Sequence, residues 1–111
     1  MARDVIKEIR KEISANKVLV YMKGTPTFPM CGFSAATVEV LQGHGYPFAH
    51  VNILEDPEKR EAIKTYSNWP TIPQVYVNGK FVGGCDIVRE LNASGELERI
   101  LEQAFAAVEG A

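Results

Sequence analysis

The dipeptide Asn78-Gly79 constrains the fold of this chain more than any other feature. It separates two short β-favouring runs, residues 74–77 and 80–82. Asn-Gly is a preferred pair for the two-residue type I′ turn, in which both residues have positive φ and the flanking strands run antiparallel. The sequence therefore predicts an antiparallel hairpin over residues 74–82.

A different pattern precedes this hairpin. Residues 18–21 are a short apolar run that suits a buried strand, residues 34–41 favour a helix, and residues 48–53 favour a second strand. A strand–helix–strand unit pairs its two strands in parallel through a right-handed crossover. Combined with the hairpin, it predicts a four-stranded mixed sheet.

Helical patterns account for most of the remaining chain. Apolar residues recur at helical spacing near the N-terminus, and Asp56-Pro57 is typical of an N-cap followed by proline in the first turn. The predicted helices outside the crossover cover residues 5–13, 57–66, 86–91 and 96–105. The resulting order, α-β-α-β-α-β-β-α-α, predicts an α/β fold of thioredoxin-like architecture, with helices on both faces of the sheet and a single domain over residues 1–111.

The charge balance excludes some classes of function. The chain has 12 Lys and Arg against 14 Asp and Glu, a net charge of −2, which argues against bulk electrostatic binding of nucleic acid or anionic lipid. No apolar run approaches the roughly 20 residues that span a bilayer. Residues 1–11 mix acidic and basic side chains and lack the apolar core of a secretory signal. We therefore expect a cytoplasmic protein that binds neither nucleic acid nor membrane.

The two cysteines, Cys31 and Cys85, are far apart in the sequence. There is no Cys-x-x-Cys, and neither His44 nor His50 has zinc-finger spacing to a cysteine. A disulfide between the two cysteines is conceivable, but a reducing compartment argues against it. We assign the histidines no ligand role.

Cys31 lies between a loop rich in Gly and Pro, residues 23–30, and the helix predicted from Ser34. The start of a helix stabilises a thiolate, and the positive charge of Lys23 would add to the effect. The alternative is a small buried apolar side chain. Ser34 stands three residues after Cys31, where a dithiol oxidoreductase has its second cysteine. Because a hydroxyl cannot resolve a mixed disulfide, the second sulfur must come from a free thiol such as glutathione.

Four motifs, in matching order and spacing, identify a resemblance over about residues 5–101. Together they resemble the single-domain monothiol glutaredoxins with the Cys-Gly-Phe-Ser signature. The motifs are Met22-Lys23-Gly24-Thr25-Pro26, Cys31-Gly32-Phe33-Ser34, Trp69-Pro70-Thr71-Ile72-Pro73-Gln74 and Gly83-Gly84-Cys85-Asp86. That family binds glutathione, and Cys31 corresponds to its catalytic and metal-ligating cysteine.

The resemblance implies a contact for the glycine carboxylate of glutathione. Lys23 and Arg60 would neutralise it, Arg60 with a bidentate fork. Taken alone, each is more often a solvated surface residue. Thr71-Ile72-Pro73 resembles the family's cis-proline loop, whose backbone at Ile72 would pair with the cysteinyl part of glutathione. The alternative is an ordinary turn.

The resemblance places the γ-glutamyl end of glutathione at the start of the next helix. Gly84 would allow close backbone approach, and the N–H groups at Cys85 and Asp86 would hold the carboxylate while the Asp86 side chain pairs with the ammonium. Asp86 alone would be an ordinary N-cap. We interpret the Cys85 thiol as a small packed side chain rather than a second redox group, and Trp69 as structural support.

Ligand counting favours a metal cluster as cargo. A [2Fe-2S] cluster needs four terminal ligands, and two copies of Cys31 with two glutathiones supply four thiolates. This predicts a cluster-bridged homodimer. The resemblance further implies a role in iron–sulfur cluster assembly, transfer and iron homeostasis, with a BolA-like partner and apo iron–sulfur proteins as recipients. The apolar loop of residues 25–30, with Phe28 and Met30, would either help such contacts or fold onto its own domain.

Two other functions stay open. The first is a glutathione-dependent monothiol oxidoreductase that reduces protein–glutathione mixed disulfides, an activity that we expect to be weak at most. The second is a binding module without redox or metal chemistry, in which the combination of Lys23, Cys31, Arg60 and Asp86 would be a coincidence.

Overall fold

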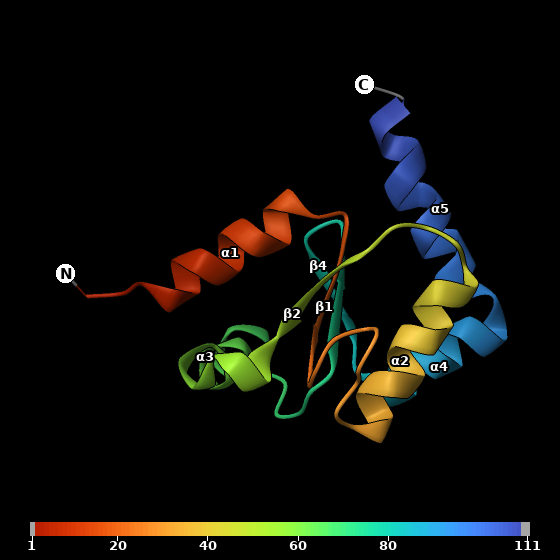
Figure 1. Cartoon of the computed structure of the whole chain (residues 1–111). Helices are drawn as coiled ribbons and strands as arrows, with labels where there is room; N and C mark the ends of the chain where they lie inside the picture. The colour runs from red at the N-terminus through yellow and green to blue at the C-terminus, as the bar shows by residue number, and fades with distance from the viewer. Residues whose placement is uncertain (1, 110–111) are drawn as a thin grey trace.

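The computed structural model of the chain describes residues 2–109 and confirms the predicted order of elements (Figure 1). One short 3-10 helix, η1, is added. The elements are α1 Val5–Ala15, β1 Val18–Met22, α2 Gly32–Gly43, β2 Ala49–Asn52, η1 Ile53–Glu55, α3 Pro57–Ser67, β3 Gln74–Val77, β4 Lys80–Gly83, α4 Cys85–Ser94 and α5 Glu96–Glu109. Residues 1, 110 and 111 of the predicted domain lie outside the described residues.

The strands form one mixed sheet in the order β2-β1-β3-β4. β1 and β2 are parallel, whereas β1–β3 and β3–β4 are antiparallel, so the predicted four-stranded mixed sheet is confirmed. Asn78 has φ 53° and Gly79 has φ 83°, the pair of positive values that a type I′ turn requires.

All five residues of β1 are buried, because helices cover both faces of the sheet. Val18, Val20 and Met22 pack into one apolar core, and Leu19 and Tyr21 into the other, following the alternation of side chains along a strand. Figure 1 shows α1 and α3 on one side of the sheet and α2, α4 and α5 on the other. The central strand β1 lies between two layers of helices and ends at Met22, so the position of the next residue, Lys23, is fixed by this strand.

The starts of two helices, α2 and α4, differ from the sequence predictions. α2 begins at Gly32, two residues earlier than predicted, so that Cys31 itself is the N-cap. The N-cap of α4 is Gly84, so the alternative of Asp86 as N-cap is wrong, and Asp86 lies in the first turn. α3 begins as predicted, with the Asp56 side chain accepting from the Lys59 N–H at 3.1 Å.

The strand predicted over residues 48–53 is shorter at both ends. Ile53 belongs to η1, because the side-chain oxygen of Asn52 accepts from the Leu54 N–H at 3.1 Å and caps that turn. The same oxygen accepts from the Gly24 N–H at 2.9 Å and so ties the end of β2 to the segment after β1. Within residues 2–109, no helix is long and apolar enough to cross a membrane.

Candidate functional site

A groove of about 430 Å³ brings together segments that are far apart in the chain. Its wall comes from the end of β1, the start of α2, one face of α3, the loop before β3 and the start of α4. All eight residues that the sequence predicts for the site border it: Lys23, Cys31, Arg60, Thr71, Ile72, Gly84, Cys85 and Asp86. Six further residues complete the lining: Phe33, Lys64, Trp69, Pro70, Pro73 and Ile87.

Cys31 is a partly exposed free thiol at the N-cap of α2. The pKa of its thiol is lowered, first by the backbone N–H of Ser34, then by that of Phe33, and further by the positive charge of Lys23. Partial burial acts in the opposite direction and does not cancel these effects. The groove therefore holds a thiolate that is more available at neutral pH than an ordinary cysteine.

Ser34 has a structural role beside this thiol. Its side chain is completely buried, and its hydroxyl accepts a hydrogen bond from the backbone N–H of Lys23 at 3.1 Å. Cys85, the other free cysteine, is only 7% exposed and is the first residue of α4, so the interpretation as a small packed side chain agrees with its burial. Neither residue supplies an accessible second sulfur next to Cys31.

The groove carries three basic side chains and one acidic side chain. Lys23, Arg60 and Lys64 border one part of it, and Asp86 comes from α4. Arg60 is half-buried rather than fully exposed, and its Nε has no hydrogen-bond partner among residues 2–109. The three basic side chains make the groove suited to an anionic group of a ligand.

Sequence reasoning missed Lys64 as a groove residue. The signal was present, because Lys64 lies four residues after Arg60 and residues at this spacing share one face of a helix. For Trp69 the sequence left two alternatives, a wall of the site or a cap on the core, and structural support was the interpretation; this half-buried side chain borders the groove. The Trp69 ring packs against Phe81, with centroids 5.6 Å apart, so it also supports the wall from behind.

The loop before β3 contains the predicted cis peptide bond, between Ile72 and Pro73. Pro73 and Ile72 both border the groove. Close packing joins this loop to α4, because a Cβ added at Gly84 would lie 3.1 Å from Trp69 Nε1 and 3.3 Å from the Pro73 carbonyl oxygen. Gly84 thus permits the close approach of α4 to the cis-proline loop.

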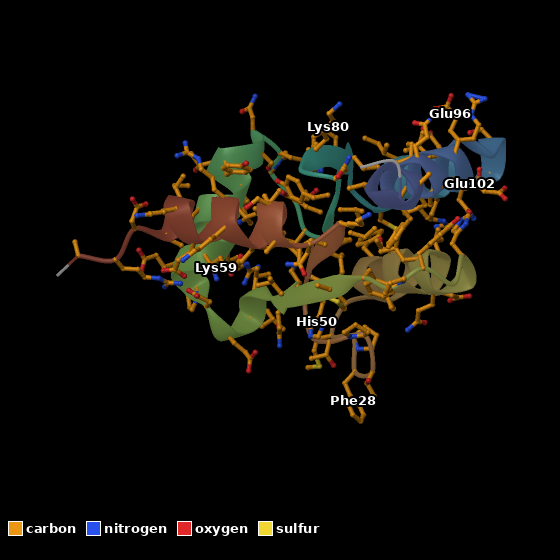
Figure 2. The ribbon with its side chains drawn as sticks, turned by 90° about the horizontal axis from the view of Figure 1, so that it is seen from above. Phe28, His50, Lys59, Lys80, Glu96 and Glu102 are labelled. Carbon is orange, nitrogen blue, oxygen red and sulfur yellow. The ribbon has the colours of Figure 1, made fainter. Side chains whose placement is uncertain are left out.

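An exposed apolar patch lies beside the Cys31 thiol. Phe28, Met30 and Phe33 are 75%, 68% and 63% exposed, and Figure 2 shows Phe28 directed away from the rest of the chain. The Phe28 loop is itself ordered, since Thr25 donates its N–H to the Phe28 carbonyl and Met30 donates its N–H to the Lys23 carbonyl. Of the two alternatives for this loop, folding onto its own domain does not agree with the exposure of Phe28 and Met30.

The histidines lie outside the groove. His44 Nε2 is 2.7 Å from Asn92 Oδ1, and His50 is exposed on β2. Among residues 2–109 there is no group of three or more His, Cys, Asp or Glu side chains that could hold a metal ion.

Comparison with known proteins places this geometry in a family. The glutaredoxin family model matches residues 18–82. The chain is 57% identical over 94 residues to a monothiol glutaredoxin of Synechocystis, covering 85% of this chain and 88% of the relative. It is 50% identical over 111 aligned residues to the mitochondrial monothiol glutaredoxin-5 of Saccharomyces cerevisiae, covering 97% and 74% of the two chains.

A solved structure gives the same result for the fold. The solution structure of reduced apo GrxS14 from poplar matches with a TM-score of 0.82 and 45% identity, covering 92% of this chain and 94% of the other. The thioredoxin-like fold predicted from the order of strands and helices is therefore confirmed.

Proposed function

This chain belongs to the glutaredoxin family, with the single-cysteine active loop of its monothiol members, and we propose that it binds glutathione beside Cys31 and carries a labile [2Fe-2S] cluster between two copies of itself. The observation that supports this most is the groove in which Cys31 is the one accessible thiol among the described residues. Basic side chains and the start of α4 border the same groove.

The charges of the groove fit a tripeptide with ionised ends. Lys23 and Arg60 bind the glycine carboxylate through charge-assisted hydrogen bonds. At the other end, the N–H groups at the start of α4 bind the γ-glutamyl carboxylate, and the Asp86 carboxylate pairs with the ammonium. The middle residue lies against Ile72, which places its thiol toward Cys31.

The donor set then determines how the cluster is held. Cys31 supplies one thiolate and bound glutathione a second, so that two copies of this assembly supply the four terminal ligands of a [2Fe-2S] cluster. The exposed side chains of Phe28, Met30 and Phe33, which lie within three residues of Cys31 in the chain, become buried when the second copy approaches. Protein residues provide only half of the ligands, and the other half exchange with free glutathione.

A cluster held in this way is easily released, which suits a carrier. We propose that the chain acts in the cytoplasm in cluster assembly, cluster transfer and iron homeostasis. Its proposed partners are a BolA-like protein and apo iron–sulfur proteins that receive the cluster, without contact to nucleic acid or membrane. The support for the partners and the compartment is the family resemblance.

Anaerobic reconstitution with iron and sulfide, with and without glutathione, tests the proposal. Wild-type protein is expected to become coloured and dimeric only when glutathione is present, as read by visible absorption and size-exclusion chromatography. Cys31→Ser should stay colourless and monomeric. Cys85→Ala is the matched control: it removes the other thiol but keeps the backbone N–H at the start of α4, and should reconstitute like wild type.

A colourless, monomeric wild type under these conditions would contradict the carrier role. If that protein reduced glutathione mixed disulfides, with turnover lost in Cys31→Ser, the monothiol oxidoreductase would be the function. A protein whose partner binding is unaffected by Cys31→Ser would instead be a binding module.

A further inference from the structure

Gln74 is a buried polar residue that the proposed function leaves without a role. Its side chain is completely buried at the first position of β3. Nε2 donates to the carbonyl oxygens of Trp69 at 3.1 Å and Thr71 at 3.2 Å. Since a primary amide has two N–H donors on its nitrogen, both are used, and both serve the loop that borders the groove.

The acceptor end of the same amide is also held. The Tyr76 hydroxyl donates to Gln74 Oε1 at 3.1 Å. Burial raises the pKa of Tyr76 to about 12, so its hydroxyl stays protonated at neutral pH. The Tyr76 ring is itself packed against Tyr21 and Phe81, with centroids 5.8 Å and 5.4 Å away. Gln74 is therefore fixed from the core side, and its contacts with the loop are made from a rigid position.

The geometry of the peptide bond links the position of Gln74 to the direction of a backbone N–H at the groove. The peptide bond between Thr71 and Ile72 is trans, because the cis bond of this loop lies between Ile72 and Pro73. In a trans peptide unit the C=O and the N–H point in opposite directions. Because Gln74 binds the Thr71 oxygen, the Ile72 N–H must point away from Gln74. No hydrogen bond among the described residues uses that N–H, and Ile72 borders the groove.

We propose that Gln74 is a positioning residue, which holds the Thr71 carbonyl inward so that the Ile72 N–H is aimed at the backbone carbonyl of the middle residue of a bound peptide thiol. This inference rests on the proposed function in taking glutathione as the ligand. In this inference the Ile72 N–H contacts the ligand backbone, and Gln74 acts only by holding the peptide unit that carries this N–H.

Ser67 offers a matched control, because it holds the same loop at another point. Its hydroxyl accepts from the Trp69 N–H at 3.1 Å and also interacts with the Tyr76 hydroxyl, but among the described residues it makes no hydrogen bond to the peptide unit between Thr71 and Ile72. Ser67→Ala therefore removes an anchor of the loop without releasing the Thr71 carbonyl. Gln74→Met keeps the size of the side chain and removes all three of its hydrogen bonds.

The test is an NMR titration of ¹⁵N-labelled protein with S-methylglutathione, whose blocked sulfur excludes disulfide chemistry with Cys31. In wild type and Ser67→Ala, the amide signals of Ile72, Cys85 and Asp86 are expected to shift together. In Gln74→Met, affinity should fall about tenfold, the size expected for one lost hydrogen bond in the complex. The response at Ile72 should disappear while those at Cys85 and Asp86 persist at higher ligand concentration.

Two results would overturn the inference, and they are distinguishable. If Gln74→Met binds within twofold of wild type and keeps the Ile72 response, Gln74 has no positioning role, and the proposed function is untouched. If wild type itself shows no response at any groove amide, the proposed function fails and the inference with it. Should Gln74→Met not give a folded spectrum, Gln74→Leu decides by the same readout, because it also removes both donors to the loop carbonyls.

Discussion

The Ser34 hydroxyl accepts a hydrogen bond from the Lys23 backbone N–H at 3.1 Å, which joins the first turn of α2 to the end of β1. This contact holds the two segments that carry Cys31 and the Lys23 charge at a fixed separation. The residue that makes this active loop monothiol is thus also a structural element of the site, since it is completely buried.

Ser34→Ala removes the acceptor of the Lys23 N–H. We expect the free energy of unfolding to fall by about 1–3 kcal/mol, the cost of leaving a largely buried donor without a partner. Urea denaturation followed by circular dichroism measures this change. The exposed Ser14, whose hydroxyl only donates to the Lys11 carbonyl within α1, is the control, and Ser14→Ala should stay within about 0.5 kcal/mol of wild type. Equal effects of the two variants would contradict a structural role for Ser34.

Lys23→Met removes the positive charge that helps to lower the pKa of the Cys31 thiol. The rate of alkylation by iodoacetamide at pH 7 is expected to fall about two- to fivefold, the size of one screened charge interaction. The pH at which the alkylation rate reaches half of its maximum should rise. Lys80→Met, at the exposed first position of β4, removes the same charge outside the groove lining and should leave the rate unchanged.

The same pKa shift predicts how stability depends on pH. Between the lowered pKa of folded Cys31 and the ordinary value of about 8.5, the unfolded chain binds more protons than the folded chain. The contribution of Cys31 to the free energy of unfolding is therefore complete above pH of about 8.5 and is lost as pH falls through the folded pKa. Comparison of wild type with Cys31→Ser by urea denaturation at several pH values isolates it, and an opposite slope would contradict the stabilised thiolate.

Gly24→Ala tests the ordered loop before Cys31. Gly24 has φ +90°, and an added Cβ would lie 2.4 Å from the Phe28 carbonyl oxygen. We expect a loss of at least about 2 kcal/mol in the free energy of unfolding, from the left-handed backbone and the clash together. Gly43→Ala, where a Cβ meets nothing within 4 Å, is the control and should be neutral or slightly stabilising. A neutral Gly24→Ala would show that the loop is free to rearrange.

Phe28→Ser tests the apolar patch as the surface where two copies meet. Since Phe28 is 75% exposed, the free energy of unfolding should change by no more than about 0.5 kcal/mol. The reconstituted dimer should dissociate at lower dilution, as measured by sedimentation velocity. Leu54→Ser, at 41% exposure in η1, replaces an apolar side chain that does not border the groove and should leave the dimer intact. Equal weakening by both variants would speak against a specific contact at Phe28.

Much of this fold is predictable because local signals agree with one another. The Asn78-Gly79 turn sets the pairing of Val77 with Lys80 and of Tyr76 with Phe81, before the register shifts at Val75. The apolar run of residues 18–21 marks a strand covered on both faces. Cys31 is predictable as a helix-start thiol because Gly and Pro precede it and helix formers follow. These features depend on neighbouring residues, which a sequence displays directly.

Other parts of the site depend on contacts between distant segments. The turn at Ile53 forms because the Asn52 side chain caps it while also binding Gly24, which strand propensity alone does not reveal. The position of Trp69 in the groove wall follows from its packing beneath Gly84. The role inferred for Gln74 likewise requires the carbonyls of a loop to be seen in place.

Native mass spectrometry of the anaerobically reconstituted protein tests the central proposal most directly, because it counts the components of the complex. The account predicts a mass equal to two chains, two glutathiones and one [2Fe-2S] cluster, and its loss in Cys31→Ser. When glutathione is withheld, the colour of the cluster and the mass peak of this complex should be lost together. A cluster on a single chain, or a cluster-bridged dimer without glutathione, would contradict the shared thiolate ligation on which the proposed carrier role depends.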